Sequence, residues 1–467
     1  MIACEAYATK HVVVVGLGKS GLAAARALCR SGARVVAWDD GEEARARASA
    51  DAIAVRDLAL IDWSRVDALV LSPGIAHTFP TPHPAARLAK QAGVPIIGDS
   101  ELLATSGTDA AMIAITGTNG KSTTTALIGH ILQHAGREVE VGGNLGPAIC
   151  DMAMLEPDGA YVLELSSYQL ELCPSARFKI AVLLNISADH LDRHGGMHGY
   201  VQAKKNIFHN QGPGDVAVVG IDDPSCRDTA LELHRKSGLK VVPISATQTA
   251  PGGVYIDGAN LIDDLRGAAQ KIIDVSRLIH LPGIHNGQNI AAAYATARHM
   301  QVAVETIVDG MKSFPGLAHR QERVGELSGV TFVNDSKATN AVAAARALAC
   351  YDNIFWIAGG IAKDGGAVGL EPFMGSVRGA FLIGAAAPVF ADQLGGHVPT
   401  NTCGDLPTAT RAAFSAAEDW VAEGRGSAMV LLSPACASFD QFENFEQRGE
   451  AFRGIFAELE KTCRRSA

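Results

Sequence analysis

Short runs of apolar, mostly β-branched residues alternate along the chain with longer Ala- and Leu-rich stretches that have helical periodicity. Buried parallel strands have such continuous apolar runs, because connecting helices cover both faces of their sheet. The pattern therefore predicts an α/β fold. The main strands that it predicts lie at residues 12–15, 34–38, 68–71, 112–115, 161–163, 330–333, 354–357, 381–383 and 429–432.

Two breaks divide these strands into three groups. A polar stretch ends the first group near residue 104, and Phe314-Pro315-Gly316 ends a helical stretch before the last group. The chain has 467 residues, and domains hold roughly 150 residues each. We therefore expect three domains, at residues 1–104, 105–316 and 317–467.

Composition and charge exclude several classes of protein. Hydrophobic residues make up 48% of the chain and charged residues 19%, as in ordinary globular proteins. The net charge of −9 and the lack of a Lys/Arg-rich run argue against a nucleic-acid partner. The sequence shows no signal peptide and no apolar span of about 18 residues, so we expect a cytoplasmic protein without membrane insertion. Nine cysteines without CxxC pairs indicate neither a disulfide framework nor a zinc site.

A glycine-rich turn follows the first predicted strand. Its sequence, Gly16-Leu17-Gly18-Lys19-Ser20-Gly21, has the G-x-G-x-x-G spacing that lets backbone amides approach a diphosphate at the start of a helix. Asp39 follows the next strand, where an acid can hold a ribose hydroxyl. A dinucleotide site, a site for another nucleotide and a purely structural turn all remain open on this motif alone.

A second loop, between the strand at 112–115 and a helix, is more specific. Its backbone N–H groups can wrap phosphate oxygens, Lys121 can neutralise the β and γ phosphates, and the Ser122 hydroxyl suits a magnesium ion. Ile115 stands where the common phosphate loop has its first glycine, so this loop is a variant. Its expected phosphate-binding residues are Gly117, Thr118, Asn119, Gly120, Lys121, Ser122 and Thr123.

Charged side chains follow two further strands of the second group. Glu164 ends one of them and could direct a carboxylate to a magnesium ion at the phosphate loop, although a solvated charge is an equal alternative. The stretch from Asp189 to Lys204 concentrates acids, imidazoles and amines. A lone histidine is usually a satisfied polar group, but His190 comes directly after a buried-looking strand, which favours a functional role.

Eight stretches, in order over nearly the whole chain, resemble the Mur ligase family. They lie at residues 116–123, 142–146, 164–170, 189–204, 285–289, 319–320, 334–340 and 433–445. The last two resemble the glutamate-adding branch of that family. The resemblance implies an N-terminal Rossmann-like UDP-binding domain, a central P-loop-type ATPase domain with a mostly parallel sheet, and a C-terminal Rossmann-like domain for the amino acid.

The resemblance also implies sites for three substrates: UDP-N-acetylmuramoyl-L-alanine, ATP and D-glutamate. The residues implied for the UDP substrate are Gly18, Lys19, Ser20, Asp39, Ser72, Pro73, Gly74 and Asn144. Those implied for ATP, besides the phosphate loop, are Asn286, Asn289, Arg320 and Asp335. Those implied for glutamate are Lys337, Thr339, Lys363, Ser438, Phe439 and Phe445. Asp40 stands where the family leads us to expect a small hydroxyl residue.

The implied reaction forms an amide through an acyl phosphate. The resemblance places one magnesium ion at Ser122 and Glu164, and a second at His190 and Lys204, with Lys204 carried as a carbamate. Carbamylation needs the neutral amine, so we expect a lowered pKa for Lys204. The implied catalytic residues are Lys121, His190, Lys204 and Lys337.

Three other functions were weighed against this one. A relative that adds a different amino acid fits the segment 433–442 poorly, because that segment is particular to the glutamate-adding branch. A nicotinamide dehydrogenase would leave the phosphate loop, Glu164 and the His190 region unexplained. A nucleotide-sensing module would be expected to lack some of these residues. The D configuration of the glutamate is implied by the resemblance alone, as both enantiomers carry the same groups, and a monomer is expected.

Overall fold

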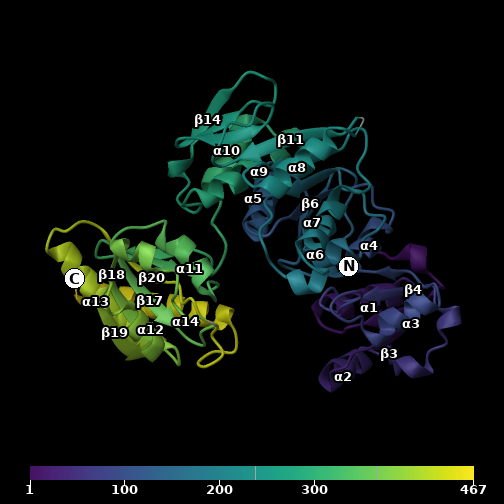
Figure 1. The fold of residues 1–467 in the computed structure, drawn as a ribbon, viewed down its shortest axis with the longest axis horizontal. Coiled ribbons are helices and arrows are strands. Elements are labelled where there is room, and N and C mark those ends of the chain that lie inside the picture. The colour runs from purple at the N-terminus through teal and green to yellow at the C-terminus, as the bar shows by residue number, and fades with distance from the viewer. Residues whose placement is uncertain (237, 364, 467) are drawn as a thin grey trace. The chain divides into compact units, whose positions relative to one another are not determined.

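The computed structural model describes residues 1–236, 238–363 and 365–466. Its strands form three sheets, and Figure 1 labels some strands of each. The chain divides into two compact units, the first made of Met1–Arg277 and Ile284–Phe314 and the second of Leu278–Gly283 and Pro315–Ala467. The first unit contains two sheets and the second contains one, and all three consist mostly of parallel strands. The predicted α/β class is confirmed.

The first sheet has five parallel strands in the order β3-β2-β1-β4-β5. They are β1 (His11–Val15), β2 (Arg34–Trp38), β3 (Ala54–Val55), β4 (Ala68–Leu71) and β5 (Ile96–Ile97). Its helices are α1 (Lys19–Arg30), α2 (Glu42–Ala50), α3 (Pro84–Gln91) and α4 (Asp99–Ala104). Because side chains alternate along a strand, Val12 and Val14 enter one hydrophobic core, while Val13 and Val15 enter another. This explains why the strand reads as an unbroken apolar run.

The second sheet has nine strands in the order β14-β13-β12-β11-β10-β9-β6-β8-β7. They are β6 (Ala111–Thr116), β7 (Val139–Gly143), β8 (Ala160–Glu164), β9 (Ile180–Leu183), β10 (Val216–Gly220), β11 (Lys240–Ser245), β12 (Val254–Asp257), β13 (Asn260–Asp263) and β14 (Gln270–Asp274). The accompanying helices are α5 (Lys121–His134), α6 (Ser167–Leu170), α7 (Met197–Lys205), α8 (Pro224–Leu233), α9 (His285–His299) and α10 (Val304–Ser313). The strand register pairs Ile115 with Glu164 and Thr116 with Leu183. The carboxyl ends of β6, β8 and β9 therefore lie side by side.

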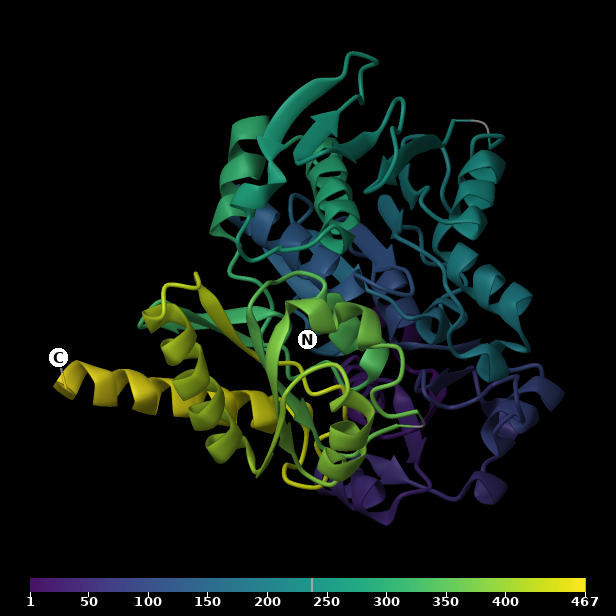
Figure 2. The ribbon, with the colours of Figure 1, turned by 60° about the vertical axis from the view of Figure 1, so that its left-hand side comes forward.

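The third sheet has six strands in the order β15-β16-β20-β17-β18-β19, of which β15 is antiparallel to its neighbour. They are β15 (Glu322–Leu327), β16 (Val330–Asn334), β17 (Ile354–Gly359), β18 (Val377–Ile383), β19 (Thr400–Gly404) and β20 (Ala428–Leu432). Its helices are α11 (Ala341–Leu348), α12 (Ala387–Leu394), α13 (Leu406–Ala422) and α14 (Phe445–Ser466), the last drawn in yellow in Figure 2. Trp356 packs with α11 and α12, while Phe355 packs with α13. Helices thus cover both faces of this sheet.

Short 3₁₀ turns complete the structure. They are η1 (Glu5–Tyr7), η2 (Leu58–Leu60), η3 (Trp63–Arg65), η4 (Ile149–Asp151), η5 (Leu191–His194), η6 (Asn206–Phe208), η7 (Val275–Arg277) and η8 (Glu371–Ser376). No helix in the described ranges is long and apolar enough to cross a bilayer.

Every strand predicted from the hydrophobic pattern is present, with ends that differ by a few residues. The predicted strand at 161–163 extends to Glu164, and the strand predicted at 381–383 begins earlier, at Val377. The predictions give no strand at β3, β5, β7, β10, β11 or β12. They also do not include the antiparallel strands β13, β14 and β15, whose exposed and half-exposed positions break the apolar runs. The predicted domain limits at residues 104 and 316 stay predictions.

Gly21 offers a test of the packing between α1 and the first sheet. A Cβ atom at this position would lie 1.7 Å from the Gly16 carbonyl oxygen and 2.8 Å from the Ser72 hydroxyl. We expect Gly21→Ala to lower the free energy of unfolding by about 3 kcal/mol, since the backbone has to move apart. Calorimetric melting of the purified protein measures this. Gly18→Ala is the control, because nothing lies within 4 Å of its added Cβ, and an equal loss in both variants would contradict the packing argument.

Candidate active site

The phosphate loop runs from the end of β6 to the start of α5 and depends on two glycines. Gly117 has φ 155° and Gly120 has φ 86°, conformations that residues with a Cβ atom rarely adopt. A Cβ on Gly117 would lie 3.0 Å from Leu184 Cβ, and one on Gly120 would lie 2.2 Å from Asn289 Oδ1. The loop therefore passes close to β9 on one side and to α9 on the other, and these approaches fix its path.

Asn185, two residues after the end of β9, holds the middle of this loop. Its Oδ1 accepts a hydrogen bond from Asn119 N (2.9 Å), and its Nδ2 donates to Asn119 O (3.1 Å) and to Gln288 Oε1 (2.9 Å). Its carbonyl accepts from Thr118 N (2.8 Å). Our site predictions did not include Asn185. The signal that could have found it is its place after a strand that neighbours the strand of the phosphate loop.

Two of the predicted ATP residues lie on α9 beside the loop. Asn289 Oδ1 accepts a hydrogen bond from the Thr124 hydroxyl (3.1 Å), and Asn289 Nδ2 donates to Asn286 Oδ1 (2.9 Å). Ser122 and Thr123 are buried in the first turn of α5. The start of α5, with the outward-facing N–H groups of a helix N-terminus and its positive dipole end, suits an anion such as a phosphate.

Lys121 and Lys204 approach the loop from different helices. Lys121 Nζ donates to the carbonyl oxygens of Gly117 (2.9 Å) and Thr118 (3.0 Å), and Lys204 Nζ donates to Gly117 O (2.8 Å). Lys204 is only 2% exposed and its amine lies 4.7 Å from the centre of the Tyr200 ring. Burial, together with the charge of Lys121, lowers the pKa of Lys204 to about 7. A large part of the amine is therefore neutral at neutral pH.

Glu164 is the last residue of β8 and is 1% exposed. Its Oε1 accepts a hydrogen bond from Asn144 Nδ2 (2.7 Å), while its Oε2 has no hydrogen-bond partner among the described residues. A buried carboxylate oxygen without a partner is costly unless a cation balances it. Within the described ranges there is no cluster of three or more His, Cys, Asp or Glu side chains that could hold a metal. The predicted magnesium ligands would not form such a cluster, because besides Glu164 and His190 they consist of the Ser122 hydroxyl and a carbamate on Lys204.

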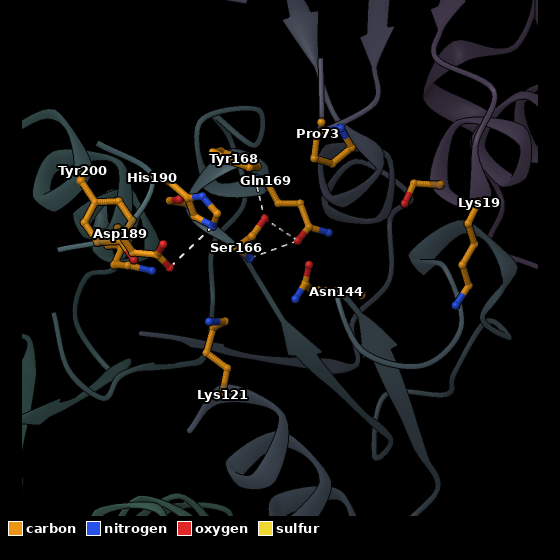
Figure 3. A pocket seen from close by; sticks show the side chains of 15 residues that line it. Lys19, Pro73, Lys121, Asn144, Ser166, Tyr168, Gln169, Asp189, His190 and Tyr200 are labelled. Carbon is orange, nitrogen blue, oxygen red and sulfur yellow. Dashed lines mark hydrogen bonds and ion pairs between the residues drawn. The ribbon is translucent and has the colours of Figure 1, made fainter. Parts of the chain in front are cut away.

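A cavity of about 410 Å³ gathers many of the predicted residues within the first unit (Figure 3). Lys19, Ser20, Pro73 and Gly74 reach it from the first sheet. From the second sheet it is lined by Lys121, Gly143, Asn144, Ser166, Ser167, Tyr168, Gln169, Asp189, His190, Tyr200 and Lys204. The structure thus brings residues predicted for the UDP substrate, for phosphate and for metal to one hollow.

His190 sits in this cavity with a backbone φ of 50°, which is uncommon for a residue with a side chain. Its ring centre lies 5.3 Å from that of Tyr168, and its Nε2 lies 3.6 Å from Asp189 Oδ2. Figure 3 shows the imidazole and Lys121 extending toward the cavity from different segments. Strain of this kind tends to occur at functional sites, where surrounding contacts hold it.

Several residues that line the cavity were not among our predicted site residues. Ser166 and Gln169 form a capping box at the start of α6, in which the Ser166 hydroxyl and the Gln169 amide oxygen exchange contacts with backbone N–H groups. The spacing Ser-x-x-Gln after a strand is the signal that could have found them. The others are Gly143, Ser167, Tyr168, Asp189 and Tyr200.

A buried charged cluster supports one wall of the cavity. Glu171 accepts a hydrogen bond from His194 Nδ1 (3.1 Å) and lies 3.6 Å from Arg193 Nη1. Arg193 Nη2 donates to Ile75 O (3.1 Å), in the loop after β4, and the guanidinium lies 5.0 Å from the centre of the Tyr168 ring. Burial raises the pKa of Glu171 and lowers that of His194 to about 4. The cluster links the two sheets of the first unit.

A second cavity of about 300 Å³ lies at the carboxyl ends of β1, β2 and β4. Its lining includes three more residues predicted for the UDP substrate: Gly18, Asp39 and Ser72. Asp39 accepts hydrogen bonds from Leu17 N (2.5 Å) and Gly41 N (2.8 Å), so it also stabilises the glycine turn. Asp40, at the position where a hydroxyl is expected, lies 3.3 Å from His83 Nε2.

The remaining predicted residues belong to the second unit. Asp335 is buried, accepts a hydrogen bond from the Ser433 hydroxyl (2.8 Å) and has its pKa raised to about 7 by burial, although the charge of Arg320 opposes this shift. Lys337 Nζ lies 5.4 Å from the centre of the Phe445 ring. Ser438 is buried and Phe439 is 70% exposed, while Lys363 is exposed and Thr339 is half-buried. The parts that these residues take in ATP and glutamate binding stay predictions.

Comparison with known proteins gives a family. A family model described as the Mur ligase middle domain matches residues 115–297, and one described as the Mur ligase MurD-like N-terminal domain matches residues 10–98. The UDP-N-acetylmuramoylalanine–D-glutamate ligase of Caulobacter sp. (strain K31) is 50% identical over 100% of both chains. The ligase of the same name from Rhodospirillum rubrum is 50% identical over 98% of this chain and 96% of its own. The chain belongs to the Mur ligase family.

Solved structures of Mur ligases have the same fold. UDP-N-acetylmuramate-alanine ligase MurC from Thermotoga maritima aligns with a TM-score of 0.58 at 16% identity, over 96% of this chain and 99% of that one. MurF from Acinetobacter baumannii aligns with a TM-score of 0.57 at 17% identity, over 97% and 93%. The predicted three-domain fold of this Mur ligase is confirmed. Its first glycine turn belongs to a MurD-like N-terminal domain, which sets aside the nicotinamide dehydrogenase.

The Asn185 contacts predict how the phosphate loop of this Mur ligase is held. In Asn185→Ala, the Asn119 N–H and C=O groups lose their side-chain partners, so we expect stability to fall by about 2 kcal/mol. Hydrogen–deuterium exchange in residues 117–121 is expected to accelerate at the same time. Asn210→Ala is the control, because Asn210 Nδ2 also donates to two carbonyls, those of Pro174 and Ala176, away from the loop. Unchanged exchange in the loop of Asn185→Ala would disprove this role.

Proposed function

We propose that this Mur ligase uses ATP to add D-glutamate to UDP-N-acetylmuramoyl-L-alanine, giving UDP-N-acetylmuramoyl-L-alanyl-D-glutamate for bacterial peptidoglycan synthesis. The observation that carries the proposal is 50% identity over the full length of a relative named for this reaction. A protein of this kind takes part in cell-wall biogenesis and hence in cell shape and division. We place it in the cytoplasm as a monomer, with no nucleic-acid partner and no membrane insertion.

The proposed reaction overcomes the poor leaving ability of a carboxylate oxygen. The alanyl carboxylate attacks the γ-phosphorus of ATP, and the bond between that phosphorus and the bridging oxygen of ADP breaks. The amine of D-glutamate then attacks the carbonyl carbon of the acyl phosphate, loses a proton and expels inorganic phosphate through a tetrahedral intermediate. Both steps concentrate negative charge on phosphate oxygens, so catalysis depends on positioning and on nearby positive charge.

The phosphate loop of the first unit is assigned to ATP. The backbone at the Gly120 end of the loop and in the first turn of α5, together with the amine of Lys121, is assigned to the β and γ phosphates, because Asn185 already holds the N–H groups of Thr118 and Asn119. Asn286 and Asn289 border the nucleotide. The UDP substrate is assigned to the two cavities, with its uracil end at Asp39. The muramoyl-alanine part lies along the larger cavity beside Asn144. The loop glycines and the buried Asn289 contacts support this assignment, because they hold the backbone amides in place.

Two magnesium ions are assigned to the neighbourhood of the larger cavity, which His190 and Lys204 line. Ser122 and Glu164 are assigned to one ion, which the partnerless Oε2 of Glu164 supports. His190 and the carbamate of Lys204 are assigned to the other. Magnesium supplies positive charge to phosphate and carboxylate oxygens. Asn144 holds one carboxylate oxygen of Glu164 through a hydrogen bond and leaves the other available.

The second unit is assigned to the amino acid and to part of the nucleotide. Lys337 neutralises the acyl phosphate, and Thr339, Lys363, Ser438, Phe439 and Phe445 form the glutamate pocket. Arg320 binds the ATP phosphates and Asp335 its ribose. We propose three domains with limits at 1–104, 105–316 and 317–467, which contribute mainly to the UDP substrate, to ATP and to the amino acid, respectively. The separate third sheet and the mostly parallel first two support this division.

Phosphate release tests the proposed reaction. The purified protein is assayed with ATP, magnesium and UDP-N-acetylmuramoyl-L-alanine, and with D-glutamate, L-glutamate, a diamino acid or no amino acid. We expect release with D-glutamate alone, together with a product heavier by one glutamyl residue in mass spectrometry. Release with L-glutamate alone would keep the ligase and reverse the stereochemistry. Release with none of the three amino acids would refute the assigned reaction.

The lowered pKa of Lys204 predicts how its carbamate depends on pH. The amine combines with carbon dioxide and loses a proton only while it is neutral, and a pKa of about 7 makes it largely neutral above pH 7. With ¹³C-bicarbonate and magnesium we expect a carbamate signal in the ¹³C spectrum at pH 8 that declines as the pH falls through 7. Activity is expected to decline with it.

Lys205 provides the matched control for this experiment, since it neighbours Lys204 but pairs with Glu232 at the surface. The carbamate signal is expected to be absent in Lys204→Met and unchanged in Lys205→Met. A signal that persists in Lys204→Met would show that the carbamate forms elsewhere.

A further inference from the structure

Arg448, in the first turn of α14, is one of the largest fully buried side chains of the second unit, with 1% exposure. Its Nε donates a hydrogen bond to the Ser336 hydroxyl (3.0 Å), and its Nη2 donates to the carbonyls of Ser336 (2.9 Å) and Cys436 (3.1 Å). The planar fork of a guanidinium can make such contacts to two chain segments at once. Arg448 thus joins the turn after β16 to the turn after β20.

These two turns carry residues proposed for the glutamate pocket. Ser336 is directly followed by Lys337, and Cys436 is followed two residues later by Ser438. The Ser336 hydroxyl in turn donates to the Phe445 carbonyl (2.8 Å), which ties in the start of α14. A displacement of the Arg448 side chain would therefore move several of the proposed glutamate-binding residues at the same time.

The loop that carries Lys363 joins the same arrangement. Ile361 and Ala437 exchange two backbone hydrogen bonds, of 2.8 and 2.9 Å. Gly360, with φ 127°, passes so close to the guanidinium that a Cβ there would lie 3.3 Å from Arg448 Nη1. Each proposed glutamate-binding residue thus lies, along the chain, within three residues of Arg448 or of a residue that its side chain contacts or closely approaches.

Among the described residues, the charge of Arg448 has no direct counter-ion. The described part of the chain offers its Nη1 no hydrogen-bond partner, and no ion pair of Arg448 is found there, although the charge of Asp440 acts on it from farther away. Burial lowers the pKa of Arg448 to about 10, so the group is positive at neutral pH. A buried charge without an ion pair is expensive. Its field is also screened far less than that of a surface charge.

We propose that Arg448 is a positioning residue of the amino-acid site, which holds the turns of Lys337 and Ser438 in register and adds a buried positive charge that favours an amino acid with two carboxylates. This inference rests on the proposed function. It concerns a residue that makes its contacts through other residues and does not touch the substrate itself.

The test compares Arg448→Met, which removes the charge, with Arg448→Lys, which keeps the charge but loses the fork. Steady-state kinetics are measured with each of the three substrates varied in turn. For Arg448→Met we expect the KM for D-glutamate to rise by about 10- to 100-fold, the range found when a supporting contact is removed from a site. The KM values for ATP and for the UDP substrate are expected to stay within about twofold. Arg448→Lys is expected to recover part of the loss.

Arg464→Met is the matched control, because Arg464 lies on the same helix, is largely exposed and pairs with Glu460. The proposal is overturned if Arg448→Met resembles this control, if all three KM values rise together, or if Arg448→Lys is as impaired as Arg448→Met. Thermal melting shows whether each variant folds.

If Arg448→Met does not fold, Ser336→Ala replaces it, since this change removes one partner of the guanidinium and leaves the charge. A rise confined to the KM for D-glutamate is then expected, and no rise refutes the proposal. Failure of the wild-type protein to add D-glutamate would refute the proposed function. A normal wild-type protein with an unaffected Arg448→Met variant would refute only the role of Arg448.

Discussion

The carbonyl oxygen of Gly117 accepts hydrogen bonds from two lysine side chains, Lys121 and Lys204, and the electrostatics of the first unit depend on this shared contact. Two ammonium groups bound to one oxygen repel each other, and burial removes the water that would otherwise screen them. Burial is the main cause of the lowered pKa of Lys204, and the charge of Lys121 adds to it. Negative groups delivered to this place, whether phosphate or a carbamate, relieve a repulsion that the fold itself creates.

The same place in the sheet explains why so many functional groups meet there. The ends of β6, β8 and β9 lie side by side, so that the phosphate loop, Glu164 and Asn185 come from neighbouring strands. The cluster of Glu171, Arg193 and His194 then supports the wall formed by Tyr168. Because Arg193 also contacts the loop after β4, the first sheet supplies its part of the cavity from a fixed position within the unit.

The sequence alone is sufficient for the features that depend on local pattern. The apolar runs predict the strands, the glycine spacing predicts the loop, and the lowered pKa of Lys204 agrees with the direction expected from the chemistry. The roles of Asn185 and Arg448 could not be predicted from local pattern, because their partners lie far away along the chain. Asn185 finds partners 66 and 103 residues away, and the contacts of Arg448 with Ser336 span 112 residues. Only the folded chain reveals that Asn185 is half-buried, that Arg448 is buried and that each side chain bonds to distant segments.

The close approach of Gly120 and Asn289 has a consequence for how this chain can change over generations. The Asn289 Oδ1 atom occupies the space that a Cβ on residue 120 would need, and it also binds the Thr124 hydroxyl. A larger residue at 120 is excluded while the asparagine is present, and a smaller residue at 289 leaves that hydroxyl without its acceptor. The two positions therefore constrain each other during evolution. A single substitution at either position costs stability unless the other residue has already changed.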